Sequence, residues 1–309
     1  MDYKKLYAEK LVSAEKAASV VKSGDWVDYG WTTGTPVAVD AAIAKRLPEL
    51  ENVNFRGGIL MWVPEIFKIE NPAEHMTWNS WHMGGIERKA IAQGFSYYAP
   101  IRYSELPRYY RESQNKPDVA VFQVSPMDEH GFFNFGPNAS HMAAVCETSK
   151  VVIVEVNENM PVCFGGTEEG VHISHVDMIV EGDNPAIAEM GGAVAASDVD
   201  EAVAKLILEE IPDGAVLSLG VGGVPFTVAN MLAQSDKTDL GCHTGTISDA
   251  FLALYKAGKL TNKKKEIDNG YSTELPWALR NYMTGWIMSR SSSIRLTSIT
   301  STPRTASVR

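Results

Sequence analysis

The chain has 309 residues, 45% of them hydrophobic, which is enough for one large or two ordinary cores. Its formal net charge of −10 argues against nucleic-acid binding, which needs clustered lysine and arginine, and favours small-molecule chemistry. Because no apolar stretch approaches the ~20 residues that span a bilayer, and no signal peptide is recognisable, we expect a cytoplasmic protein of two domains without a membrane partner.

Strand-like and helix-like segments alternate along the chain. Four short apolar runs predict strands: residues 26–29, 119–124, 151–156 and 215–219. Amphipathic patterns between them predict helices: residues 37–47, 140–147 and 199–211. Ser197 followed by Asp200 is typical of a capping box at the start of the last helix. The alternation predicts an α/β fold, in which helices cover both faces of mainly parallel sheets.

Two polar segments in the first half each admit two interpretations. Residues 32–35, Thr-Thr-Gly-Thr, precede Pro36 and either line a pocket or cap the next helix, and capping is favoured. Asp128, Glu129 and His130 form either an acid–base cluster, because a histidine beside carboxylates titrates near neutral pH, or a solvated surface turn.

The spacing of His172 and His175 is compatible with metal ligands. The sequence offers no third ligand nearby, and its three cysteines are too few and too scattered for a thiolate site. We therefore expect no metal.

A glycine-rich segment, Gly-Val-Gly-Gly-Val-Pro at residues 220–225, follows the predicted strand at 215–219. We expect Pro225 to open a helix over 226–234, and a second strand to end beside the turn at 239–245. Glycines let a ligand approach backbone N–H groups closely, and a helix N-terminus attracts anions, so the pattern predicts a site for an anionic cofactor. A tight strand-to-helix turn needs the same glycines, and that interpretation stays open.

A faint internal repeat relates the two halves of the chain. A shift of 189 residues superimposes five identical pairs: Val27 and Val216, Gly34 and Gly223, Pro36 and Pro225, Val39 and Val228, Ala44 and Ala233. So short a match is also compatible with chance. We predict a first domain over residues 1–196 and a second over 197–274, which is too short to be a complete copy.

The last segment, residues 275–309, differs in composition from the rest. It contains no Asp, Glu or Lys, is rich in Ser and Thr, and carries five arginines. Reading its reverse translation in another frame gives an ordinary amphipathic sequence. We therefore interpret it as an out-of-frame product, with a native disordered tail as the alternative.

Three motifs together resemble the acetyl-CoA hydrolase/transferase family: residues 125–136, residues 220–225, and residues 239–244 with Ser248 and Asp249. The resemblance extends to about Ser272 and is greatest to members that exchange CoA between butyryl-CoA and acetate. It implies an α/β protein of two tandem CoA-transferase-type domains with mainly parallel sheets, the second of them truncated.

The resemblance also implies a chemistry and a set of site residues. CoA passes from butyryl-CoA to acetate through a glutamyl-CoA intermediate, with CoA as a substrate and no permanently bound cofactor. The implied partners are acyl-CoA, CoA, acetate and butyrate, and a homo-oligomer is left open. The residues implied to bind CoA are Gly220, Val221, Gly222, Gly223 and Val224. Those implied to help form the acyl site are Met127, His130 and Asn134.

One position departs from the family pattern. The nucleophilic glutamate of the family follows a His-Ser or His-Thr pair, and here the residue after His243 and Thr244 is Gly245. Glycine has no side chain that attacks a thioester. Asp239 and Asp249 are not expected to replace it, because a nucleophile must be positioned within about an ångström. We therefore expect an inactive transferase; the alternative is a non-catalytic acyl-CoA- or CoA-binding protein, or an inert truncated fragment.

Overall fold

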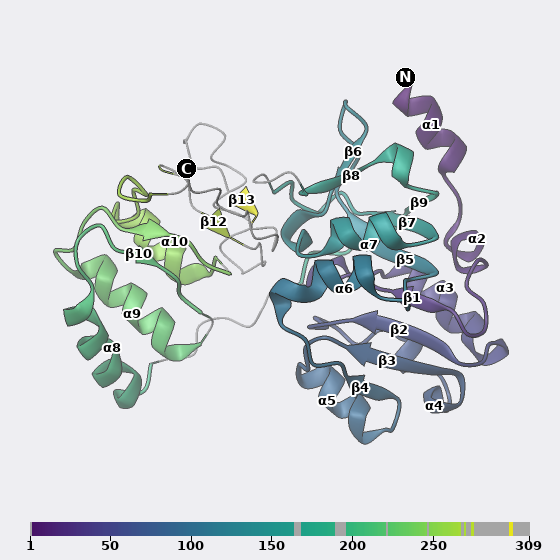
Figure 1. The fold of residues 1–309 in the computed structure, drawn as a ribbon, viewed down its shortest axis with the longest axis horizontal. Coiled ribbons are helices and arrows are strands. Elements are labelled where there is room, and N and C mark those ends of the chain that lie inside the picture. The colour runs from purple at the N-terminus through teal and green to yellow at the C-terminus, as the bar shows by residue number, and fades with distance from the viewer. Residues whose placement is uncertain are drawn as a thin grey trace. The chain divides into compact units, whose positions relative to one another are not determined.

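The computed structural model describes residues 2–163, 168–188, 196–220, 222–245, 247–266, 269, 273–274 and 297–298. Contacts divide the chain into two compact units (Figure 1). Unit 1 comprises the described residues up to 162 and from 168 to 188, and unit 2 comprises residue 163 and the described residues from 196 onward. Apart from Thr297–Ser298, the predicted tail at 275–309 lies outside the described residues.

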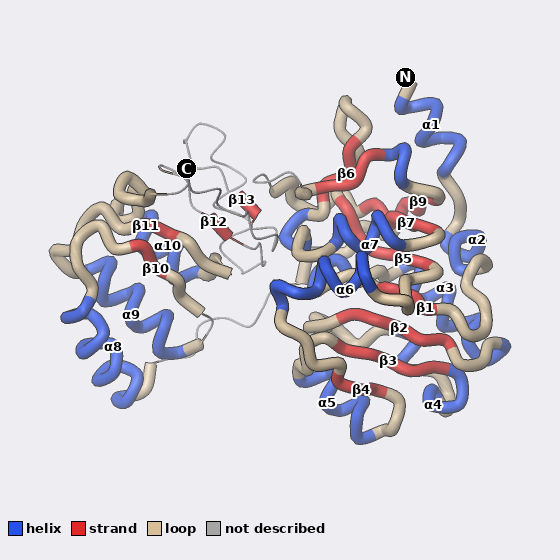
Figure 2. The backbone as a smooth tube through the Cα atoms, in the orientation of Figure 1, coloured by secondary structure: helices blue, strands red, loops and turns tan. Residues whose placement is uncertain are grey.

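Unit 1 is built on a seven-stranded sheet in which all neighbouring strands are parallel. Figure 2 shows the strands stacked in the order β4-β3-β2-β1-β5-β7-β9. Their bounds are β1 (Trp26–Asp28), β2 (Val53–Gly57), β3 (Met76–Ser80), β4 (Ser96–Tyr98), β5 (Val119–Val124), β7 (Val151–Val156) and β9 (Met178–Glu181). The predicted strands at 119–124 and 151–156 coincide with β5 and β7, because continuous apolar runs suit strands covered on both faces. The predicted α/β class with a mainly parallel sheet is confirmed.

Helices cover both faces of this sheet, and α2 and α3 pack with the core residues Val27, Ile43 and Phe55. The helices of unit 1 are α1 (Tyr3–Lys10), α2 (Ala14–Ala18), α3 (Ala38–Arg46), α4 (Pro72–His75), α5 (Gly85–Ala92), α6 (Leu106–Glu112) and α7 (Met142–Thr148). Short 3₁₀ turns are η1 (Thr32–Gly34), η2 (Leu47–Glu49), η3 (Glu65–Phe67), η4 (Tyr103–Glu105), η5 (Gly136–Asn138) and η6 (Ile173–His175). None of the helices that the structure describes combines the length and apolar character needed to cross a bilayer.

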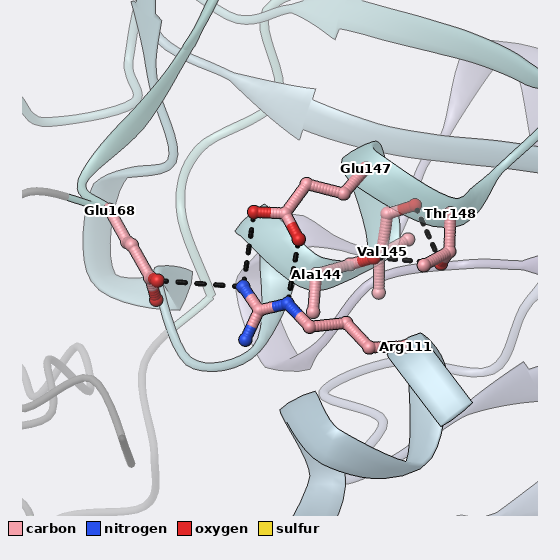
Figure 3. Close-up of polar contacts among 6 residues, drawn as sticks. All are labelled: Arg111, Ala144, Val145, Glu147, Thr148 and Glu168. Carbon is pink, nitrogen blue, oxygen red and sulfur yellow. Dashed lines mark hydrogen bonds and ion pairs between the residues drawn. The ribbon is translucent and has the colours of Figure 1, made fainter. Parts of the chain in front are cut away.

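An ion-pair cluster joins α6, α7 and the segment that leads into β8 (Gly170–His172), which pairs antiparallel with β6 (Phe132–Asn134). The Arg111 guanidinium donates to both carboxylate oxygens of Glu147, with Nε–Oε2 at 2.6 Å and Nη2–Oε1 at 3.0 Å (Figure 3). Glu168 Oε1 lies 3.6 Å from Nη2. The hydrogen bonds to Glu147 raise the pKa of Arg111. The guanidinium therefore links α6 to α7 and to the segment that precedes β8.

A buried carboxyl on α3 makes the stability of unit 1 depend on pH. Asp40 accepts hydrogen bonds from the Tyr29 hydroxyl at 3.2 Å and the Glu65 N–H at 2.6 Å, yet its burial raises its pKa to about 7. Above about pH 4 the unfolded chain has released this proton while the folded chain keeps it, so we expect stability to fall as pH rises from 4 through 7, by at most about 1.4 kcal/mol per pH unit. Denaturant unfolding at several pH values should show this slope. Asp40→Asn should reduce this slope without removing it, because burial also raises the pKa of Asp28 to about 6. Glu129→Gln, at an exposed side chain, should leave the slope unchanged.

Unit 2 contains α8 (Asp198–Glu210), β10 (Val216–Leu217), α9 (Gly223–Gln234), β11 (Gly241–Cys242) and α10 (Asp249–Lys256), with a further pair of two-residue strands, β12 (Thr273–Glu274) and β13 (Thr297–Ser298). β10 and β11 are parallel, and Leu240 forms an isolated parallel bridge with Leu260. The predicted capping box is confirmed, because the Ser197 and Asp200 side chains each accept the other's backbone N–H.

The order of elements agrees with the predicted repeat. In unit 1, α2 is followed by β1, a polar turn, α3 and the parallel strand β2. In unit 2, α8 is followed by β10, a glycine turn, α9 and the parallel strand β11. Both segments are therefore built as the same helix–strand–helix–strand unit.

Candidate functional site

A small cleft lies at the carboxyl-terminal edge of the unit 1 sheet. The chain runs from β1 outward through β2, β3 and β4, and then returns to begin β5 on the other side of β1. Open α/β sheets bind ligands where the strand order reverses in this way. Thr33, after β1, and Gln123, near the end of β5, both line the cleft, whose volume is ≈ 220 Å³. The remaining lining residues are mostly apolar: Val37, Trp62, Pro185, Ala186, Ile187 and Ala188.

Side chains from distant segments hold the wall formed by residues 32–35. The Asn138 side-chain oxygen accepts hydrogen bonds from the hydroxyls of Thr32 and Thr33, the second at 3.0 Å. The Gln123 amide donates to the carbonyls of Thr33 at 3.3 Å and Thr35 at 2.7 Å. These bonds satisfy buried polar groups and fix the shape of the loop.

A carboxylate from another strand caps α3. Glu155 of β7 accepts the backbone N–H groups of Val37, Ala38 and Val39 at 3.0, 3.1 and 2.9 Å. Val37 is the N-cap and makes no side-chain cap bond, so the prediction that residues 32–35 cap this helix is wrong. Burial raises the pKa of Glu155, against the effect of these hydrogen bonds. The carboxyl fixes the first turn of α3, which forms part of the cleft wall.

We expect Glu155→Ala to destabilise unit 1, because it leaves the buried N–H group of Val39 without its acceptor at roughly 1–3 kcal/mol, together with two partly buried N–H groups that water can reach more easily. Glu155→Gln keeps one acceptor oxygen and should cost less. Chemical denaturation of both variants tests this order. Equal stability of Glu155→Ala and the parent chain would contradict the assigned capping role.

The acidic segment at 128–130 forms a tight turn. Asp128 Oδ1 accepts the N–H groups of His130 at 2.9 Å and Phe132 at 2.8 Å. The side chains of Glu129 and His130 are 87% and 76% exposed and lie 3.6 Å apart. A solvated surface turn therefore describes this segment better than an acid–base cluster.

The three residues that the resemblance assigns to the acyl site differ in their surroundings. Met127 is half-buried, His130 is exposed and Asn134 is buried. None of them lines the cleft. Asn134 Oδ1 accepts the Gly136 N–H at 2.8 Å, and the following η5 turn carries Asn138, which bonds the cleft wall. The loop is thus connected to the cleft through η5.

His172 and His175 show no sign of a shared ligand. His172 Nδ1 lies 2.8 Å from the Ser174 hydroxyl oxygen, and its ring packs against Tyr3 and Phe132. In the part of the chain that the structure describes, no three His, Cys, Asp or Glu side chains are grouped to hold a metal ion.

In unit 2 the glycine-rich turn joins β10 to α9. Gly222 is the N-cap of α9 with φ +133° and ψ 177°, a conformation that other residues adopt only under strain. The helix begins at Gly223, three residues before the predicted start, because Gly222 turns the chain directly into it. Pro225 fits in the first turn because the N–H groups there have no partner within the helix. Among the described residues no side chain makes a cap hydrogen bond to this helix, so its N-terminal N–H groups are suited to an anion. Val221 lies outside the described residues.

The end of β11 brings position 245 next to this turn. The His243 N–H donates to the Leu217 carbonyl at 3.0 Å, and the Thr244 hydroxyl donates to the Leu219 carbonyl at 3.2 Å. Gly245 is exposed, and a Cβ atom built on it meets no atom of the described residues within 4 Å, its chain neighbours aside. A Cβ atom at this position is therefore compatible with the described surroundings.

The two nearby carboxylates are held in other surroundings. Asp239 accepts the Thr261 hydroxyl at 3.0 Å and lies at the start of the β11 segment. Asp249 is the first residue of α10; its Oδ1 atom and the Ser248 hydroxyl are buried without a hydrogen-bond partner among the described residues. The contacts of these two carboxylates give no indication that either replaces the side chain missing at position 245.

Sequence reasoning missed four residues that build the cleft: Gln123, Asn138, Glu155 and Trp62. Two of them carried a usable signal, because Gln123 and Glu155 are single polar residues near the end of otherwise apolar strands. Such residues lie at the carboxyl edge of a parallel sheet, where ligands bind.

A sequence profile of the acetyl-CoA hydrolase/transferase N-terminal domain matches residues 1–190. The chain belongs to the acetyl-CoA hydrolase/transferase family. This family member is 65% identical over 268 residues to the butyryl-CoA:acetate CoA-transferase of Anaerostipes caccae, across 87% of this chain and 60% of that protein. The resemblance inferred from the three motifs is confirmed.

Two solved structures share the fold. RipA from Yersinia pestis matches with a TM-score of 0.85 and 27% identity, over 97% of this chain and 70% of that one. The 4-hydroxybutyrate CoA-transferase from Porphyromonas gingivalis matches with a TM-score of 0.76 and 25% identity, over the same shares. This family member spans about 60% of the length of the curated relative from Anaerostipes caccae.

Proposed function

We propose that this chain descends from an enzyme that exchanges CoA between butyryl-CoA and acetate, and that it now binds acyl-CoA without completing the exchange. The identity of 65% over 268 residues to the Anaerostipes caccae enzyme supports the descent. Gly245, at the position where the resemblance places a nucleophilic glutamate, supports the loss of exchange.

The proposed CoA site is the turn of Gly220, Val221, Gly222, Gly223 and Val224. The uncapped N-terminus of α9 supports this, because its N–H groups attract phosphate or a developing oxyanion. The proposed acyl site is the unit 1 cleft, and we propose that Met127, His130 and Asn134, which do not line it, contribute only through the loop that leads to η5. At ≈ 220 Å³ the cleft is smaller than pockets for drug-sized molecules, and its mostly apolar lining suits a short acyl chain.

The proposed ancestral reaction proceeds through covalent steps. A glutamate carboxylate attacks the butyryl-CoA carbonyl and expels CoA thiolate, which leaves a mixed anhydride. The thiolate attacks the glutamyl carbonyl, releases butyrate and forms glutamyl-CoA. Acetate then attacks this thioester, and the expelled thiolate takes the acetyl group from the second anhydride, which regenerates the carboxylate. Gly245 supplies no carboxylate, so the first step has no nucleophile in this chain.

Calorimetric titration with CoA and with butyryl-CoA, followed by an exchange assay with labelled acetate, tests the proposal. We expect saturable binding of both ligands and no transfer of label. Exchange above the level of a mock purification would overturn the inactivity. Absence of any CoA binding would favour the alternative, an inert fragment.

The cytoplasmic location is part of the same proposal, with CoA as a diffusible substrate and no permanently bound cofactor, nucleic acid or membrane partner. The net charge of −10 supports the absence of nucleic-acid and membrane partners, because proteins that bind nucleic acids or anionic lipid surfaces usually carry clustered basic residues.

A further inference from the structure

Asn157, the residue after β7, joins two walls of the unit 1 cleft. The first wall is formed by Thr33, Val37 and Gln123, and the second by residues 185–188. The Asn157 side-chain amide donates to the Gln123 side-chain oxygen at 2.8 Å and to the Pro185 carbonyl at 2.9 Å. Asn157 is 1% exposed and does not itself line the cleft. One buried side chain therefore connects lining segments that are distant in the sequence.

The hydrogen bonds continue from Asn157 through Gln123 into the first wall. The Gln123 side-chain nitrogen donates to the carbonyls of Thr33 at 3.3 Å and Thr35 at 2.7 Å. All four of these residues are at most 2% exposed. Because unpaired polar groups are costly when water cannot reach them, these bonds keep the two walls in one relative position.

Backbone groups decide which way both side-chain amides point. The carbonyls of the two threonines and of Pro185 can only accept, so amide nitrogens must face them. The Gln123 oxygen is then left for Asn157, whose own oxygen accepts the Asn159 N–H at 2.9 Å. A carboxylate in place of the Asn157 amide would therefore set its oxygen against two other acceptor oxygens.

The residues that follow Asn157 hold the approach to the second wall. The Glu158 N–H donates to the Asn184 side-chain oxygen at 2.8 Å, and the Asn159 side chain donates to the Asn184 carbonyl at 2.6 Å. Glu158 and Asn159 are exposed, so water can replace their bonds more easily. The buried Asn157 is the member of this segment that reaches the first wall.

We propose that Asn157 is a positioning residue that sets the width of the cleft, and that the cleft of this width selects unbranched short acyl chains over branched ones. This inference rests on the acyl site proposed above and adds the residue that gives this site its selectivity. One methylene more or less in a close-fitting apolar pocket changes binding by roughly 10- to 200-fold. The pocket can use this difference only if its walls stay at a fixed spacing, because walls that move apart admit the bulkier chain.

Methyl NMR on the full chain tests the inference, because Val37 lies in the first wall and Ile187 in the second. The ligands are free butyrate and its branched relative 2-ethylbutyrate. Neither ligand contains CoA, so the proposed CoA site does not enter the measurement. We expect butyrate to shift the methyl signals of both residues saturably, and to bind at least tenfold more tightly than 2-ethylbutyrate.

The variant Asn157→Asp keeps the shape of the side chain and replaces its two N–H donors by an oxygen. We expect it to bind butyrate at least tenfold more weakly than the parent chain, and to prefer butyrate over 2-ethylbutyrate by less than about threefold. A merely structural role would lower the affinity for both carboxylates by the same factor and leave the preference unchanged. If Asn157→Asp does not fold, Asn157→Ser removes the amide without adding charge and should lose the preference likewise.

Asn79→Asp is the matched control for the loss of a side-chain amide. Asn79 lies on β3, does not line the cleft, and donates to the Phe55 carbonyl at 3.2 Å. Its replacement should lower the melting temperature while leaving the affinity for butyrate and the preference over 2-ethylbutyrate at the parent values.

Two results would overturn this inference and leave the acyl site in place. One is equal affinity of the parent chain for the two carboxylates, and the other is an Asn157 variant that keeps the parent's preference. A different result, no shift of the Val37 and Ile187 methyl signals by butyrate in the parent chain, would overturn the acyl site itself and this inference with it.

Discussion

Purified chain is expected to transfer no CoA from butyryl-CoA to acetate, even with saturating substrates. Position 245 lies beside the glycine turn and carries only hydrogen, so the proposed glutamyl intermediate would have no carboxylate from which to form. Removing a nucleophile from an enzyme typically lowers turnover by a factor on the order of 10⁶. An exchange assay with labelled acetate, together with mass spectrometry for covalently attached CoA, should therefore give neither acetyl-CoA nor an adduct.

The variant Gly245→Glu separates a missing nucleophile from other defects. A Cβ at this position meets no atom of the described, non-adjacent residues within 4 Å, so the variant should fold as well as the parent, as should the control Gly85→Glu at another open glycine. We do not expect Gly245→Glu to restore turnover alone, because the chain spans about 60% of its curated relative. When the Gly245→Glu chain is joined to the remaining part of that relative, we expect turnover to be restored. Full activity from the single substitution would contradict this expectation.

Gly222→Val is expected to abolish CoA binding and to destabilise unit 2. At φ +133° a β-branched residue is strained by about 1–3 kcal/mol, so the turn must shift and the first N–H groups of α9 lose their directions. The added side chain also blocks close approach of a ligand to the backbone. Calorimetry with CoA and thermal unfolding should both show the loss.

Gly220→Val provides a matched control for the strain. Gly220 lies in the same turn, and a Cβ there meets no atom of the described, non-adjacent residues within 4 Å. This variant should leave the melting temperature close to that of the parent chain. If Gly222→Val kept the parent's affinity for CoA, the turn would not be the CoA site.

Local patterns in the sequence were sufficient where a structure depends on neighbouring residues. The apolar runs of β5 and β7 were located to the residue, because a strand buried on both faces needs continuous apolar side chains. The capping box of α8 was evident because its two side chains lie three residues apart. The absence of a carboxylate at Gly245 is likewise a property of the sequence alone.

Contacts between distant segments decided the rest. The cap of α3 comes from Glu155, more than a hundred residues away, so no local pattern at residues 32–35 could reveal that those threonines are not the cap. The cleft joins Thr33, Gln123 and Pro185, which meet only because β5 returns to pair with β1. The exposure of Leu206 was hidden for the same reason: an amphipathic pattern shows that a helix has an apolar face, and only its packed neighbours determine whether that face is covered.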